Sequence, residues 1–308
     1  MNRLNDFATA LWQSLLSIAK IVLQSRLCTH IPKHSGCNEL VVLGNGPSLR
    51  GTIDNHMPFL RERTLLAVNF AACADDFFAL RPQYYVLADP HFFQATDQPN
   101  VQRLWQVLGC EVNWAMTLLV PHRFAKQMRA KSLGTGNAHL TVVFYNTTPV
   151  EGFAWFENVA FSANLGMPRP RNVLIPSIML GIALGFNTIY VAGADHSWTR
   201  TLSVDDDNRV VSIQPHFYKE DEREEKRVRK DYMNYPLHMI LQSFYVAFRS
   251  YFTIARYARH RSVKIFNITP GSFIDAFPRL SIGKRYYLLP PIYTRSVRFC
   301  QKVKASFV

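Results

Sequence analysis

Short apolar segments that end in polar residues alternate along this chain with stretches of helical pattern. Residues 39–43, Glu-Leu-Val-Val-Leu, are followed at once by glycine, which is typical of a buried strand. Helices are predicted at 177–185, with Gly185 near the C-cap position, and at 237–260. Further strands are predicted at 64–69, 84–89, 116–121, 141–145, 187–195 and 263–268. This alternation predicts an α/β, Rossmann-like fold with a mostly parallel sheet and helices on both faces.

Polar residues follow five of the predicted strands. Ligand sites in such sheets lie beyond the carboxyl ends of the strands, so a functional cleft is expected there. These residues are Gly44-Asn45-Gly46-Pro47-Ser48, Asn69, Asp89-Pro90-His91, Gly193-Ala194-Asp195-His196 and Asn267 to Ser272. The same residue types form ordinary turns, which is the alternative interpretation.

The first of these loops has features of a phosphate site. Gly44 and Gly46 would let the backbone approach a ligand. Ser48 would cap a following helix, whose N-terminus favours phosphate. The loop has neither the Walker A spacing nor G-x-G-x-x-G, so it indicates a nucleotide site without specifying one.

Charge is concentrated at the two ends of the chain. The formal net charge is +13, and ten of these charges lie in residues 1–37 and 276–308. Hydrophobic residues make up 48% of the chain, which excludes a disordered protein. The five cysteines form no C-x-x-C pair, which argues against a disulfide framework or structural zinc and favours a reducing compartment.

Both ends have features of membrane contact. Residues 1–37 contain an amphipathic helix that would either lie on a membrane surface or pack on the domain. Gln13, Ser14 and Lys20 interrupt its apolar run, so a bilayer-spanning segment is not expected. Residues 281–308 form a basic, aromatic tail that suits an anionic membrane surface or is simply solvated. No nucleic-acid-binding motif accompanies it, and nucleic acid is not expected as a partner.

Five stretches carry a family resemblance that spans residues 39–280. They are Val41-Val-Leu-Gly-Asn-Gly-Pro-Ser-Leu49, Ala67 to Phe70, Pro82 to Pro90, Pro176 to Asp195 and Lys264 to Ser272. In this order they resemble the bacterial family-42 sialyltransferases and the related MptE-like proteins. The resemblance implies a single nucleotide-binding domain that is a variant of the GT-A type, at 38–280, with a lid at about 197–230. Asp89 departs from the sialyltransferases, which have asparagine there.

The resemblance also implies a donor site. Asn45, Gly46 and Asn69 would hold the ribose and phosphate of a CMP-sugar, although Asn69 could be a turn residue and Ser177 an N-cap. The implied nucleotide- and donor-binding residues are Gly44, Asn45, Gly46, Pro47, Ser48, Asn69, Asp89, Ser177, Gly193, Tyr218, Asn267 and Ser272.

A histidine is the expected general base. A polar, turn-rich segment runs from Thr199 to Gln214 and is followed by Pro-His216-Phe-Tyr218, a composition typical of a lid. The resemblance makes His216 the base and Tyr218 a phosphate contact. His196 is the second candidate base, since an imidazole suits this role near neutral pH, and the adjacent Asp195 is also expected to be catalytic. No metal or cofactor is expected, although Asp89, His91, Asp195, His196 and His216 are of the types that bind Zn or Mn.

The expected activity is transfer of a sialic acid or a related ulosonic acid such as Kdo. The donor would be a CMP-sugar and the acceptor a glycan or lipid-linked glycan of a surface polysaccharide or lipooligosaccharide. The enzyme would lie in the cytoplasm, on the inner face of the bacterial inner membrane; its oligomeric state is left open. The alternative is an MptE-like, Mg²⁺-dependent diphosphotransferase, and a third hypothesis is a non-catalytic binding protein.

Overall fold

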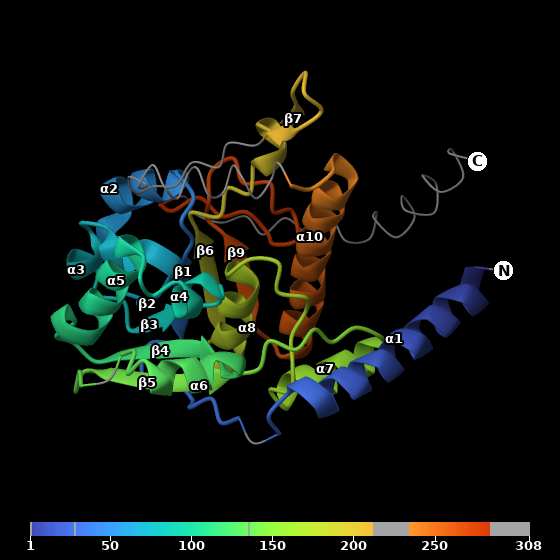
Figure 1. Cartoon of the computed structure of the whole chain (residues 1–308), viewed down its shortest axis with the longest axis horizontal. Helices are drawn as coiled ribbons and strands as arrows, with labels where there is room; N and C mark the ends of the chain where they lie inside the picture. The colour runs from blue at the N-terminus through green and yellow to red at the C-terminus, as the bar shows by residue number, and fades with distance from the viewer. Residues whose placement is uncertain (1, 28, 135, 212–233, 284–308) are drawn as a thin grey trace.

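The computed structural model describes residues 2–27, 29–134, 136–211 and 234–283. Its centre is a seven-stranded sheet in the order β5-β4-β3-β2-β1-β6-β9 (Figure 1). All neighbouring strands pair in parallel. The strands are β1 Glu39–Leu43, β2 Thr64–Val68, β3 Tyr84–Val86, β4 Met116–Pro121, β5 Leu140–Tyr145, β6 Thr188–Ala192 and β9 Lys264–Asn267. The predicted Rossmann-like α/β class is confirmed.

The strand order reverses between β1 and β6. From β1 the chain adds strands outward to β5 and then returns to place β6 on the other side of β1. The carboxyl ends of β1 and β6 therefore lie at the switch point of the sheet, where doubly wound folds bind ligands.

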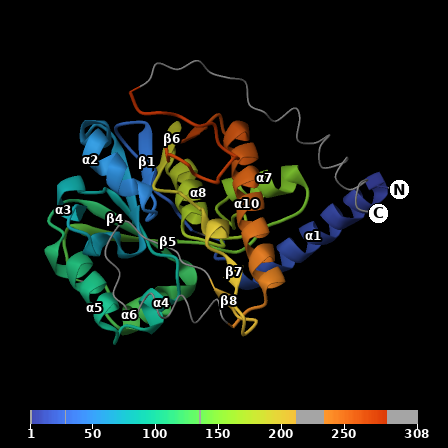
Figure 2. The same ribbon diagram turned by 90° about the horizontal axis from the view of Figure 1, so that it is seen from above.

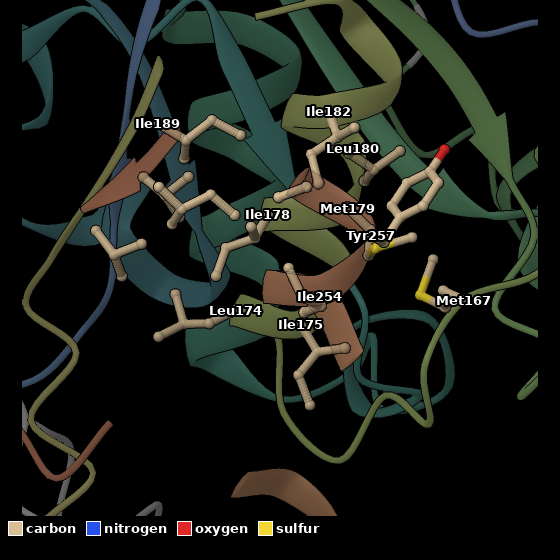
Figure 3. Packing of buried hydrophobic residues seen from close by; sticks show 14 of the residues in the cluster. Met167, Leu174, Ile175, Ile178, Met179, Leu180, Ile182, Ile189, Ile254 and Tyr257 are labelled. Atoms are coloured by element: carbon tan, nitrogen blue, oxygen red, sulfur yellow. The ribbon is translucent and has the colours of Figure 1, made fainter. Parts of the chain in front are cut away.

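Helices cover both faces of the sheet because consecutive strand residues point to opposite sides. In β1, Val41 and Leu43 pack in the cluster that contains Leu49 and Ile53 of α2 (Ser48–Arg61). Leu40 and Val42 pack in the cluster of α8 (Leu174–Leu184) and α10 (Leu237–His260). Figure 3 shows the apolar side chains of α8 beside Ile254 and Tyr257 of α10. The remaining helices are α3 Phe77–Leu80, α4 His91–Gln94, α5 Pro99–Gln106, α6 Ala125–Ala130 and α7 Ala154–Ser162.

The two predicted core helices are present, with one shifted start. Helix α10 has the predicted bounds, and α8 ends at Gly185 in the left-handed conformation, with φ 97°. However, α8 begins at Leu174, three residues earlier than predicted. Ser177 is therefore not an N-cap. It lies inside the helix, where its Oγ donates to the Val173 carbonyl at 2.7 Å.

The N-terminal helix α1 (Asn2–Gln24) packs on the domain through small polar residues. Ser17 Oγ donates to the Glu151 carbonyl at 2.8 Å, and the Phe153 amide donates to Ser14 Oγ at 3.0 Å. Helix α1 lies beside α7 in both views (Figures 1 and 2). These contacts confirm that the helix packs on the domain.

Large apolar side chains of α1 face away from these contacts. Trp12 is 62% exposed and Leu23 81%, whereas Ser14 and Ser17 are buried. By length and composition, Leu4–Gln24 is long and apolar enough to cross a membrane, which a signal sequence also is. By length and composition, therefore, the prediction that Gln13, Ser14 and Lys20 exclude a bilayer-spanning segment was wrong.

The first part of the predicted lid is an antiparallel hairpin of β7 (Ser203–Val204) and β8 (Val210–Val211). Val210 packs on Ile240 and Phe244 of α10. The rest of the lid through residue 230, including His216 and Tyr218, and the tail from residue 284 lie outside the described residues. The division at residues 37 and 280 stays a prediction.

Candidate functional site

A pocket of about 470 Å³ lies at the carboxyl ends of the strands, where the strand order reverses. Its size is in the range of small-molecule sites. Nine of the residues predicted from strand ends line it, from four different loops. They are Asn45, Gly46, Pro47, Asn69, Asp89, Pro90, Gly193, Asp195 and His196.

The glycines after β1 and β6 are required by a backbone-to-backbone contact. The Gly44 amide donates to the Ala192 carbonyl and the Gly46 amide to the Gly193 carbonyl, both at 2.8 Å. A Cβ on Gly44 would lie 2.5 Å from the Gly193 oxygen, and a Cβ on Gly193 would lie 2.5 Å from the Gly44 oxygen. The glycines therefore let the two loops approach each other. This role differs from the predicted one, in which Gly44 and Gly46 let the backbone approach a ligand.

Asp195 binds the start of α2. Ser48 Oγ donates to Asp195 Oδ2 at 2.8 Å, and the Ser48 amide lies 3.4 Å from the same oxygen. A Cβ on Gly46 would overlap that oxygen. The carboxylate thus already occupies the positive end of α2, which opposes the predicted phosphate at this helix N-terminus. Ser48 and Gly44 do not line the pocket, and Asp195 is tied to the loop.

The two asparagines at the strand ends differ in what they can offer a ligand. Asn45 is buried, and its Nδ2 lies 3.4 Å from the Val68 carbonyl. Asn69 has a left-handed backbone, with φ 52°, and its carbonyl accepts a hydrogen bond from the Tyr85 hydroxyl. Its buried Oδ1 has no hydrogen-bond partner in the described part of the chain. Buried polar atoms are nearly always paired, so this oxygen is an acceptor suited to a donor group of a ligand.

His196 is neutral and its Nε2 is occupied. This atom lies 2.6 Å from the Tyr251 hydroxyl, which in turn donates to Asn172 Oδ1 at 2.9 Å. The phenol donates its single hydrogen to Asn172 Oδ1, and the amide nitrogen of Asn172 also lies 3.4 Å from His196 Nε2. Burial lowers the pKa of His196 to about 3. An imidazole with so low a pKa is a weak base at neutral pH, which disfavours His196 as the general base.

Three arginines that were not predicted from the sequence also line the pocket. They are Arg123, Arg171 and Arg200, and none forms an ion pair with a carboxylate among the described residues. Arg123 and Thr147 follow β4 and β5, so the rule applied to the other strand ends would have found them. Arg171 precedes α8, and no sequence pattern indicates its place.

Other predicted residues have structural roles or lie elsewhere. Asn267 Nδ2 donates to Ser272 Oγ at 2.9 Å, and Ser272 Oγ donates to the Ala194 carbonyl at 2.6 Å. Both residues are buried and support the loop after β6 without lining the pocket, and the structure does not bring Ser177 to the pocket either. Asp89 is exposed at the edge of the pocket, where its Oδ1 accepts a hydrogen bond from the His91 amide at 2.8 Å.

Carboxylates, thiols and imidazoles are not clustered. Within the described ranges, no three His, Cys, Asp or Glu side chains lie close enough together to hold a metal ion. The lining of the pocket includes three asparagines and three arginines besides Asp89 and Asp195, and guanidinium groups suit an anionic ligand.

Comparison with known proteins gives limited context. No protein-family model matches the chain, and no curated protein does. Among solved structures, the MAf glycosyltransferase from Magnetospirillum magneticum AMB-1 is similar at 15% sequence identity, with a TM-score of 0.46. The match covers 93% of this chain and 40% of that one, so this chain spans less than half of its length. These comparisons assign the chain to no family.

Proposed function

We propose that the protein is a glycosyltransferase that takes its sugar from a nucleotide sugar, with a CMP-linked sialic acid or related ulosonic acid as donor. The observation that carries this proposal is the set of three arginines, Arg123, Arg171 and Arg200, at the crevice where the strand order reverses. Guanidinium groups bind phosphate through charge-assisted hydrogen bonds. Arginines without carboxylate partners in the described structure are available for this purpose.

The proposed reaction needs the arginines, a general base and further contacts to the nucleotide. The acceptor hydroxyl oxygen bonds to the anomeric carbon of the sugar while the bond from that carbon to the phosphate oxygen breaks. CMP leaves with the electron pair, and the arginines stabilise the charge that develops on its phosphate. The hydroxyl proton passes to a general base, for which His216 stays the prediction, with Tyr218 as a further phosphate contact. Asn69 Oδ1 would accept a hydrogen bond from the nucleoside. In this scheme arginine charge replaces a metal ion.

An MptE-like diphosphotransferase is the second candidate, because two carboxylates line the pocket. Mg²⁺ in such sites is bound by one or two carboxylates together with substrate phosphates. Asp195 is held by Ser48, so Asp89 is the carboxylate on which this alternative depends. The arginines favour the first candidate.

The exposed apolar side of α1 supports a place at a membrane. Trp12 and Phe7 are 62% and 58% exposed on this helix, and aromatic residues of this kind are favoured at lipid interfaces. We propose that the protein lies on the inner face of a bacterial inner membrane and acts on a lipid-linked glycan. Binding of the C-terminal tail to the same surface stays a prediction.

A thermal-shift titration with CMP, CTP, ATP and GTP, each with and without Mg²⁺, tests the proposal. We expect CMP to raise the melting temperature without Mg²⁺, and Arg200→Gln to reduce this effect. Arg61→Gln, at the exposed C-terminal end of α2, is the matched control and should behave as wild type. A response to ATP with Mg²⁺ and none to cytidine nucleotides would favour the diphosphotransferase.

A further inference from the structure

A second cavity, of about 650 Å³, adjoins the nucleotide pocket. The two cavities share part of their lining, namely Arg123, Thr147, Pro170 and Arg171. The second cavity reaches Gln24, the last residue of α1, at its other end. The second cavity therefore touches both the nucleotide pocket, through this shared lining, and the end of the N-terminal helix.

The lining of the second cavity is basic. It contains three arginines, Arg123, Arg169 and Arg171, and no aspartate or glutamate. Arg169 pairs with Glu151 at 2.7 Å, whereas Arg123 and Arg171 form no ion pair within the described ranges. An excess of guanidinium charge in a concave site attracts anions.

His122, also in the lining, adds no positive charge. Its Nε2 lies 3.0 Å from Nη1 of Arg26. Burial, together with the charges of Arg26 and Arg129, lowers the pKa of His122. The imidazole is therefore neutral at physiological pH, and its Nε2 accepts from Arg26. The charge that a ligand meets in this cavity comes from the arginines.

Tyr145 lines this cavity and also a smaller one, and its hydroxyl is an unpaired hydrogen-bond donor among the described residues. Tyr145 is 1% exposed, and its oxygen has no hydrogen-bond partner in the described part of the chain. Burial raises the pKa of Tyr145, so the phenol keeps its hydrogen. A buried donor without a partner is costly unless a ligand or water satisfies it. Its neighbour Asn146 is, by contrast, fully used in contacts with Arg26, Thr29 and Asn164.

We infer that this second cavity is an anion subsite, which binds a phosphate, diphosphate or carboxylate group of the acceptor next to the nucleotide pocket. Arg123 and Arg171 stand between the two sites, and the Tyr145 hydroxyl donates to the bound anion. That the anion belongs to the acceptor rests on the proposed glycosyltransferase function; the anion subsite itself does not. The anion comes either from a soluble sugar phosphate or from a lipid headgroup whose apolar part lies on α1.

Titration calorimetry with inorganic diphosphate tests the subsite in the full-length protein, first alone and then saturated with CMP. We expect diphosphate to bind in both cases. Tyr145→Phe should weaken diphosphate binding about tenfold, the usual effect of losing one hydrogen bond to a charged group, and leave CMP binding unchanged. Tyr190→Phe is the matched control, because its hydroxyl contacts Glu39 at 2.9 Å, away from both cavities.

Two results would overturn the inference: competition between diphosphate and CMP for one site, or diphosphate binding that Tyr145→Phe leaves unchanged. Failure of CMP to bind while diphosphate binding still depends on Tyr145 would reject the proposed donor and retain the anion subsite. Vesicles that contain a dialkyl phosphate identify the source of the anion. Vesicle binding that Tyr145→Phe weakens indicates a lipid headgroup, and an effect confined to soluble diphosphate indicates a soluble acceptor.

Discussion

The Tyr251 hydroxyl joins His196 to Asn172, at 2.6 Å from His196 Nε2 and 2.9 Å from Asn172 Oδ1. Asn172 Oδ1 also accepts from the backbone amides of Leu174 and Ile175, at 3.1 and 3.3 Å. One short chain of hydrogen bonds thus connects the loop after β6, helix α10 and the first turn of α8. The loop after β6 and the residues at the start of α8 line the pocket, and Tyr251 of α10 joins them.

Tyr251→Phe should lower the free energy of unfolding by about 1–2 kcal/mol. Tyr251 is fully buried, so the substitution removes two hydrogen bonds, those to His196 Nε2 and Asn172 Oδ1, where water cannot replace them. Urea unfolding measures the change. Tyr245→Phe on the same helix, at a residue that is 62% exposed, should have almost no effect. Equal stabilities of the two variants would contradict the role given to this network.

The pKa of His196 makes stability fall on acidification. Its folded value of about 3 lies below the unfolded value of about 6.5, so between these values the unfolded state binds the additional proton. The contribution of His196 to the free energy of unfolding is complete above pH 6.5 and decreases as the pH falls toward 3. At pH 5 the loss from this group is about 2 kcal/mol relative to neutral pH.

His196→Asn isolates this effect. Asparagine tolerates the left-handed backbone of residue 196, whose φ is 50°, and does not titrate. Urea unfolding at pH 7 and pH 5 should show a smaller loss of stability in the variant than in wild type. The same loss in both proteins would mean that other groups cause the acid sensitivity.

Gly46→Ala should strongly destabilise the pocket, because the added Cβ overlaps Asp195 Oδ2 and lies 2.7 Å from the Gly193 oxygen. We expect a loss of about 2 kcal/mol or more, together with weaker nucleotide binding. Gly51→Ala is the matched control. It lies in α2 with no atom within 4 Å of the added Cβ, and should stabilise the helix by up to about 1 kcal/mol. Similar melting temperatures for the two variants would contradict the close packing of the two loops.

Trp12→Glu should reduce binding to vesicles of anionic lipid, measured by co-sedimentation. The substitution places a charge on the exposed apolar side of α1, where Trp12 is 62% exposed, and leaves Ser14 and Ser17 in contact with the domain. Gln102→Glu adds the same charge at an exposed residue of α5, and this variant should bind vesicles as the wild type does. Equal binding of both variants would reject α1 as the membrane contact.

The strand pattern predicted the part of the pocket at the ends of β1, β2, β3 and β6, because this part depends on local sequence. Buried strands have continuous apolar runs, and their ends are marked by Asn45, Asn69, Asp89 and Asp195. What those residues do could not be predicted in the same way. Asp195 binds a helix 147 residues away in sequence, and this contact depends on how the two loops meet.

The orientation of α1 was also beyond sequence analysis. Leu11 and Leu15 fall near one face of the helical pattern, yet they are 43% and 52% exposed. The serines pack instead, because their hydroxyls hydrogen-bond with the backbone of residues 151–153. Such a contact requires that segment to be in place, and no pattern in α1 itself indicates it.

The backbone hydrogen bonds of Gly44 and Gly46 continue the pairing of β1 and β6 beyond the strands themselves. The floor of the pocket is therefore formed before any ligand arrives, and binding need not order it. A ligand that meets a formed site loses little affinity to conformational entropy. Related ligands should then associate with this part of the pocket at similar rates, and differ mainly in how long they stay bound.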